Sequence, residues 1–139
     1  MISRILTLAF LTVLASCGFG IDKKELEKDA EMLANDKCQT IWVTTKLDRV
    51  TKHLAIIEDS LKMSNLDERT VRRLTFYKFK RRDEIDYYTQ QKQAYTNNNA
   101  EEEKRLRADK YAHATAWKKL NEMTDELLKK KKDSCIPVD

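Results

Sequence analysis

Three cysteines and two histidines are the side chains best suited to covalent or metal chemistry in this chain. Thiolates bind metals, attack electrophiles and form disulfides, and histidine often shares such sites. His53 and His113 lie far along the chain from Cys38 and Cys135, without the spacing of a zinc site. No Ser/His/Asp or Cys/His arrangement and no glycine-rich phosphate loop occurs. The sequence therefore predicts neither an enzyme nor a metal site.

The remaining cysteine, Cys17, follows a short apolar segment at the amino terminus. Arg4 supplies a positive charge, residues 5–14 are mostly apolar, and Ala15 and Ser16 are small. A charged start, an apolar run of roughly 7–15 residues and small residues before the cleavage site are typical of a secretory signal peptide.

The tetrapeptide Leu14-Ala15-Ser16-Cys17 resembles the lipobox of bacterial lipoproteins. The resemblance covers residues 1–17 only. It implies cleavage before Cys17, diacylglycerol on its thiol and an N-acyl chain such as palmitate on its new amino group. It also implies a lipid-anchored protein of the cell envelope, and Gly18 in place of an aspartate indicates the outer membrane rather than the inner one. An ordinary signal peptide with an incidental cysteine, or an uncleaved anchor, is the alternative interpretation.

Composition predicts an all-α domain after this segment. Charged residues make up 36% of the chain but the net charge is only +4, which indicates a solvated surface of mixed sign. The chain has two glycines and one proline, and none of them lies between residues 21 and 136, so the usual turn signals are missing. We expect a cleaved signal peptide at 1–16, a lipidated tether at 17–21 and a single helical domain at 22–139.

Apolar spacing indicates where the helices lie. Spacings of four and three alternate along one seam: Val43, Leu47, Val50, Leu54, Ile57 and Leu61. Such a seam is typical of a helix that packs against other helices. Ser64 and Asp67 resemble a capping box that starts a second helix, and the polar run 96–99 reads as a loop. We therefore expect an elongated antiparallel three-helix bundle, with helices at about 22–63, 66–95 and 100–132.

The cysteines left over after lipidation, Cys38 and Cys135, raise a conflict. Two cysteines in an oxidising compartment favour a disulfide. In the expected bundle, however, the first and third helices run parallel, and the two cysteines would lie roughly 35 Å apart along the axis, whereas a disulfide needs Cα atoms within about 7 Å. A further chain reversal near 35–37, a bond between two chains and no pairing within the subunit all stay open.

The strongest charge feature is a set of basic residues interleaved with Phe76, Tyr77 and Phe79. Its members are Arg69, Arg72, Arg73, Lys78, Lys80, Arg81 and Arg82. Basic and aromatic residues together can bind the phosphates and bases of nucleic acid. An envelope protein rarely encounters nucleic acid, so anionic lipid, an acidic polymer or an acidic protein is the better candidate partner. In the expected bundle the lysines at 118–119 and 129–132 lie toward the same end and complete a basic pole. A solvated helix face is the simpler interpretation.

These observations predict an envelope lipoprotein that acts as a non-catalytic structural or interaction module. Its partners would be the lipid bilayer, through Cys17, and an envelope protein or anionic polymer at the basic pole. No nucleic-acid partner, no metal and no cofactor other than the covalent lipid is expected. The alternative is an inhibitor or immunity protein that acts on an envelope-targeted enzyme or toxin. The sequence does not predict the oligomeric state.

Overall fold

The computed structural model describes residues 21–137, and every regular element in this range is helical. Helix α2 spans Lys23–Ser60, α3 spans Glu68–Asp109 and α4 spans Ala114–Lys131, and the short 3-10 helix η1, Lys132–Cys135, follows directly. At 1.5 Å per residue, α2 and α3 are about 57 and 63 Å long. The prediction of an all-α chain with three main helices is confirmed.

Both long helices begin at aspartate caps. The Asp22 carboxylate accepts a hydrogen bond from the Lys24 backbone N–H at 3.1 Å. Asp67 accepts one from the Thr70 N–H at 2.9 Å and another from the Thr70 hydroxyl at 2.6 Å. These bonds satisfy N–H groups that the start of a helix leaves without an intrahelical partner. Because Asp67 is itself the cap, the second helix begins at Glu68, slightly later than expected.

The predicted loop at 96–99 is wrong, because this segment lies inside α3. Asparagine lowers helix propensity by less than about 1 kcal/mol per residue, which contacts with a neighbouring helix can offset. The Asn99 side chain donates a hydrogen bond to the Thr40 hydroxyl at 2.9 Å. Lys37 forms an ion pair with Glu103 at 3.2 Å. These contacts with α2 support a continuous helix through the asparagines.

The chain turns instead at 110–113, between α3 and α4. The Tyr111 side chain is fully buried, and its hydroxyl donates a 2.9 Å hydrogen bond to the Asp29 carboxylate on α2. The Lys110 ammonium lies 3.1 Å from the same carboxylate. Adjacent residues of a helix point in different directions, so a continuous helix would not bring both side chains to one carboxylate. This attachment to α2 ends α3 at Asp109.

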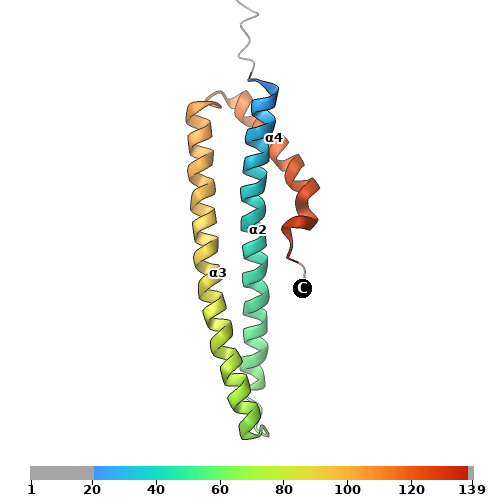
Figure 1. Ribbon diagram of the computed structural model, residues 1–139, viewed down its shortest axis with the longest axis vertical. Coiled ribbons are helices and arrows are strands. Elements are labelled where there is room, and N and C mark those ends of the chain that lie inside the picture. The colour runs from blue at the N-terminus through green and yellow to red at the C-terminus, as the bar shows by residue number, and fades with distance from the viewer. Residues whose placement is uncertain (1–20, 138–139) are drawn as a thin grey trace, which may run out of the picture.

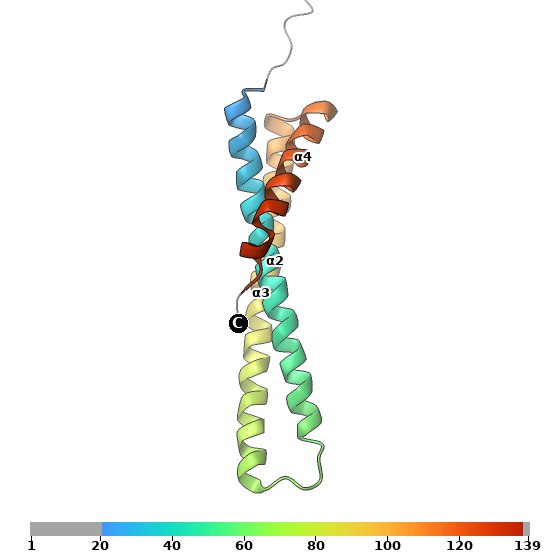
Figure 2. The same ribbon diagram turned by 90° about the vertical axis from the view of Figure 1, so that its right-hand side faces the viewer.

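Helices α2 and α3 lie side by side and run antiparallel, while α4 packs along the amino-terminal half of α2 (Figures 1 and 2). At the opposite end, Glu58 contacts both Lys78 and Arg82 of α3. The last turn of α2 is therefore level with Lys78, and α3 starts about two turns beyond it. The start of α3 has no neighbouring α2 turn beside it (Figure 2).

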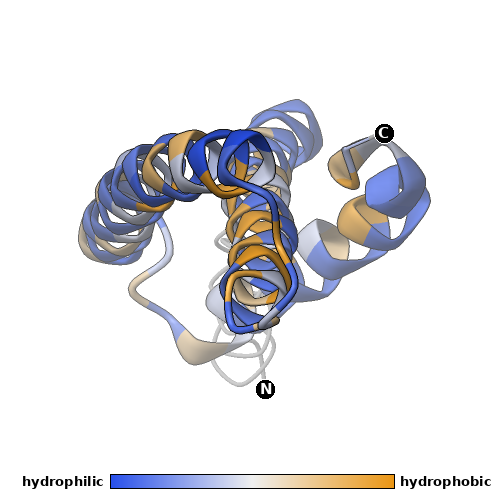
Figure 3. Cartoon of the chain, turned by 90° about the horizontal axis from the view of Figure 1, so that it is seen from below, coloured by the Kyte–Doolittle hydropathy of each residue, from blue (hydrophilic) through white to orange (hydrophobic). Residues whose placement is uncertain are grey.

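The hydrophobic core lies in the half of the molecule that contains α4. Its fully buried members come from all three helices and the 110–113 turn: Leu26, Ala30, Leu33, Leu106, Tyr111 and Leu120. By contrast, no residue from 51 to 105 is buried. We call residues 51–95 the distal half. Seen along the axis from that end, most of the helical ribbon has the colour of hydrophilic residues (Figure 3).

Cys38 and Cys135 form a disulfide within the chain, with Cα atoms 5.0 Å apart. The large axial separation expected from the sequence is wrong, because that estimate started the last helix at residue 100. The real α4 starts at Ala114 and has only 18 residues, so its end is level with Cys38. The disulfide fastens η1 to α2 and closes a loop across a sequence separation of 97 residues.

Candidate binding face on the distal half

The seven basic residues singled out in the sequence lie on the amino-terminal part of α3, at the end of the molecule opposite the start of α2 (Figure 1). The lysines at 118–119 and 129–132 lie on α4 and η1, beside the other half of α2. The two groups are at different ends, so the predicted basic pole is wrong. The cause is the turn at 110–113, which places the short α4 next to the start of α2.

Two of the seven basic residues form ion pairs across the α2–α3 contact, and a third forms an ion pair within α3. Lys78 Nζ lies 3.2 Å from Glu58 Oε1, and Arg82 Nη2 lies 3.1 Å from the same oxygen. Hydrogen bonds from these two cations lower the pKa of the Glu58 carboxyl. Arg81 pairs with Glu84 at 2.5 Å on α3 itself. These three cations are therefore already paired with carboxylates of the same chain.

The other four basic residues lie on the side of α3 that faces away from α2. Arg72 pairs only with Glu68, one turn earlier, and the two side chains are 79% and 80% exposed. Such a pair contributes little stability and is easily exchanged for another. Arg69, Arg73 and Lys80 form no ion pair with any described residue. These four cations are available to a partner.

Aromatic side chains project from the same side of α3. Phe76 is 65% exposed and Phe79 is 60% exposed, although phenylalanine is usually buried. With their exposed neighbours they form a strip that we call the outer face: Arg69, Arg72, Arg73, Phe76, Phe79, Lys80, Asp83, Asp86 and Tyr87. Exposed apolar side chains with a polar rim mark interaction sites.

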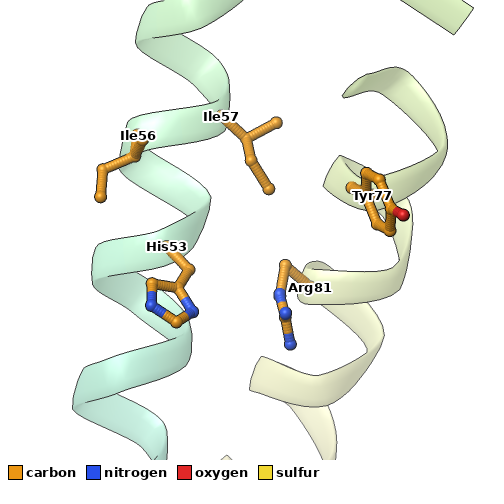
Figure 4. Close-up of a pocket in the computed structure, with 5 residues that line it drawn as sticks. All are labelled: His53, Ile56, Ile57, Tyr77 and Arg81. Carbon is orange, nitrogen blue, oxygen red and sulfur yellow. The ribbon is translucent and has the colours of Figure 1, made fainter. Parts of the chain in front are cut away.

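A groove of about 440 Å³ lies beside the outer face, between α2 and α3. His53, Ile56 and Ile57 line it from α2, and Tyr77 and Arg81 line it from α3 (Figure 4). Ile57 extends toward α3, while the Tyr77 ring and the Arg81 side chain lie on the opposite wall (Figure 4). The groove can take an apolar side chain, with polar groups at its rim. This groove could not be predicted from the sequence, because its formation depends on the register of α2 against α3.

A second polar cluster lies at the other end of the molecule, around the 110–113 turn. Asp29 is 5% exposed and accepts the hydrogen bond from Tyr111, and Lys110 Nζ also lies 2.7 Å from Glu25. Hydrogen bonds to Glu25 and Asp29 raise the pKa of Lys110. Burial and the bond to Asp29 raise the pKa of Tyr111. This cluster was not predicted from the sequence, although an aspartate on the apolar stripe of Leu26 and Leu33 is a signal for it.

This cluster predicts a loss of stability at alkaline pH. The unfolded tyrosine ionises near pH 10, and the folded state resists ionisation of Tyr111, so its contribution is complete below about pH 10 and is lost above it. We expect Tyr111→Phe to lower the free energy of unfolding at pH 8 by about 1–3 kcal/mol, because Asp29 loses a buried donor. Between pH 8 and pH 11, urea unfolding should show a smaller decrease in the free energy of unfolding for the variant than for the wild-type chain. Equal decreases would contradict this prediction.

The remaining sequence predictions concern lipidation, metal binding and the membrane. Cys17, the predicted lipidation site, lies outside residues 21–137. Within that range no group of three or more His, Cys, Asp and Glu side chains could hold a metal ion. Also within it, no helix combines the length and apolar character needed to cross a membrane.

Comparison of the chain with protein-family models, with curated proteins and with solved structures gave no match.

Proposed function

We propose that this chain is a lipid-anchored protein of the bacterial cell envelope, in the outer rather than the inner membrane. Its helices, arranged as an elongated three-helix bundle, act as a non-catalytic interaction module. The outer face is the binding surface. The observation that carries this proposal is the pair of exposed phenylalanines, Phe76 and Phe79, among available cations on a part of the hairpin that α4 does not reach.

Two observations support the location. The sequence Leu14-Ala15-Ser16-Cys17 after an apolar segment resembles a lipobox. The disulfide between Cys38 and Cys135 fits an oxidising compartment, because reducing systems keep most cytosolic thiols unpaired. Two or more acyl chains at Cys17 would give stable anchoring, since each buried CH₂ contributes about 0.8 kcal/mol and one chain alone is marginal.

The chemistry of the outer face favours a protein partner over an anionic polymer. Lys78, Arg81 and Arg82 already pair with carboxylates of this chain, which leaves fewer cations for a polymer. Asp83 and Asp86 on the same face would repel a polyanion. Exposed aromatic side chains contribute most when a partner excludes water from them. Apolar contact, with charges at the rim, is the expected mode of binding.

The long helices place this surface away from the anchor. The start of α2 follows the predicted tether, and the outer face lies near the far end of the hairpin. Along α2 this distance is about 57 Å. A partner bound at the outer face is therefore reached from the membrane by a rod of α2 and α3.

This proposal predicts that partner binding depends on the outer face and that the chain carries lipid. The Phe76→Ala/Phe79→Ala variant should lose the envelope partners that the wild-type chain retains when it is captured from crosslinked membranes. Its stability should change by less than about 0.5 kcal/mol, since both side chains are exposed. Intact-mass analysis of the captured wild-type chain should find Cys17 as the first residue, with diacylglycerol attached.

The matched control is Ile41→Ala/Ile136→Ala, which removes two exposed apolar side chains near the end of α4. This variant should keep the same partners. If Phe76→Ala/Phe79→Ala retained all partners, the outer face would not be the binding site. An intact Met1 or an unmodified Cys17 would contradict the proposed lipid anchor.

A further inference from the structure

The charges on the outer face follow an order along α3. Basic residues come first, with Arg69, Arg72 and Arg73, and acidic residues come last, with Asp83 and Asp86. Phe76, Phe79 and Lys80 lie between them. All of these side chains are exposed, so the strip is positive at one end, apolar in the middle and negative at the other end.

Such a strip is complementary to itself when one copy is turned end to end. In a two-fold symmetric contact both subunits use the same patch. The positive end of one strip therefore meets the negative end of the other only when the two helices are antiparallel. We infer that the outer face binds the same face of a second copy of this chain, in an antiparallel pair centred near Lys78. This inference rests on the proposed function of the outer face and names one of its partners.

The antiparallel register brings unlike groups together. With the centre near Lys78, Arg72 of one copy is level with Glu84 of the second copy, between Asp83 and Asp86. Opposite charges at this spacing attract, and the exposed pair of Arg72 with Glu68 is readily exchanged for them.

The aromatic residues meet near the two-fold axis of the same pair. The two Phe79 side chains are about 3 Å apart along the axis, so they can contact each other. Lys80 of one copy is level with Phe76 of the second, and Arg69 is level with Tyr87. A cation beside an aromatic ring is favourable in both cases.

The shape of the hairpin leaves room for this contact. The start of α3 extends about two turns beyond α2, so a second hairpin can approach it without meeting α2. The area involved is that of one helix face, which is typical of weak association.

An anionic membrane surface is a less suitable partner for this face. Arg69, Arg72, Arg73 and Lys80 would be attracted to it, but Asp83 lies on the same strip as Phe76 and Asp86 lies one turn farther along. Both carboxylates would be brought against negative head groups. In the antiparallel pair they face arginine instead.

Cysteine crosslinking in membranes of cells that express the full-length chain tests the register. Phe79→Cys should give a covalent dimer with a short thiol-to-thiol crosslinker, because the two side chains meet near the axis. Tyr87→Cys should not crosslink to itself, because the two copies of this residue would be about 27 Å apart. Cells that express Arg69→Cys and Tyr87→Cys together should give the mixed dimer.

Charge exchange tests the contacts. In the Phe79→Cys background, Arg72→Glu should reduce the crosslinked fraction about fivefold, and so should Asp83→Arg/Asp86→Arg. Combining all three changes should restore it. Lys119→Glu on α4 is the control and should have no effect, and circular dichroism should show that every variant keeps its helices.

Several results would overturn the inference. Absence of the Phe79→Cys dimer would exclude self-pairing, and efficient self-crosslinking of Tyr87→Cys would exclude the antiparallel register. Failure of the triple charge exchange to restore crosslinking would exclude the proposed pairs. If vesicles with anionic lipid bind the wild-type chain but not Phe76→Ala/Phe79→Ala, and no dimer forms, the face contacts membrane instead. Loss of envelope partners in the capture experiment is measured separately, so the proposed function can stand when self-pairing fails.

Discussion

Replacing both disulfide cysteines with alanine should lower the free energy of unfolding by about 4–5 kcal/mol. The Cys38–Cys135 bond closes a loop across 97 residues, and the loss of chain entropy in the unfolded state grows with loop length. Cys135 is fully buried, so alanine is preferred to serine because it adds no unsatisfied hydroxyl. Urea unfolding followed by circular dichroism measures the change.

A reductant provides the control for this prediction. It should lower the stability of the wild-type chain toward that of Cys38→Ala/Cys135→Ala, and it should leave the variant unchanged. Because η1 and α4 are fastened to α2 by this bond, their amide hydrogens should exchange faster in the variant. A stability difference below about 1 kcal/mol would contradict the entropic argument.

Leucine truncations should have very different effects in the two halves of the molecule. Leu33 on α2 is 1% exposed and belongs to the hydrophobic core, so Leu33→Ala should lower the free energy of unfolding by about 3–4 kcal/mol. Leu54 lies on the same kind of seam but is only half-buried, and Leu54→Ala should cost about 1 kcal/mol. Both substitutions remove the same atoms, so each serves as the control for the other.

This pair of variants is compared by urea unfolding under identical conditions. A large difference is expected because the size of the cavity depends on how completely the neighbouring side chains enclose it. If Leu54→Ala were as destabilising as Leu33→Ala, the distal half would be packed more tightly than the exposure of its residues indicates.

Much of the fold could be predicted because its causes are local. The missing glycine and proline between residues 21 and 136 indicated helices, and the apolar spacing from Val43 to Leu61 identified the face of α2 that meets α3. The boundary between α3 and α4 could not be predicted, because it depends on Tyr111 reaching Asp29, 82 residues earlier in the chain. No local residue type marks this turn, whereas the asparagines at 97–99 suggested one that does not exist.

The error in one boundary explains the other errors. Starting the last helix at residue 100 moved its end too far along the axis. This put the two cysteines too far apart in the expected bundle and placed the α4 lysines beside the wrong end of α3. The basic cluster itself could be identified from the sequence. Its division into cations that pair with Glu58 or Glu84 and cations on the outer face requires the register of α3 against α2, which depends on contacts distant in sequence.

The position of the disulfide also determines how the protein responds to proteases. Every peptide bond from Cys38 to Cys135 lies inside the covalent loop that the bond closes. A single cut at the exposed connection between α2 and α3, or anywhere else in this loop, leaves both fragments joined through sulfur. One such nick therefore cannot release any part of this loop into solution, and release requires a second cut or a reductant.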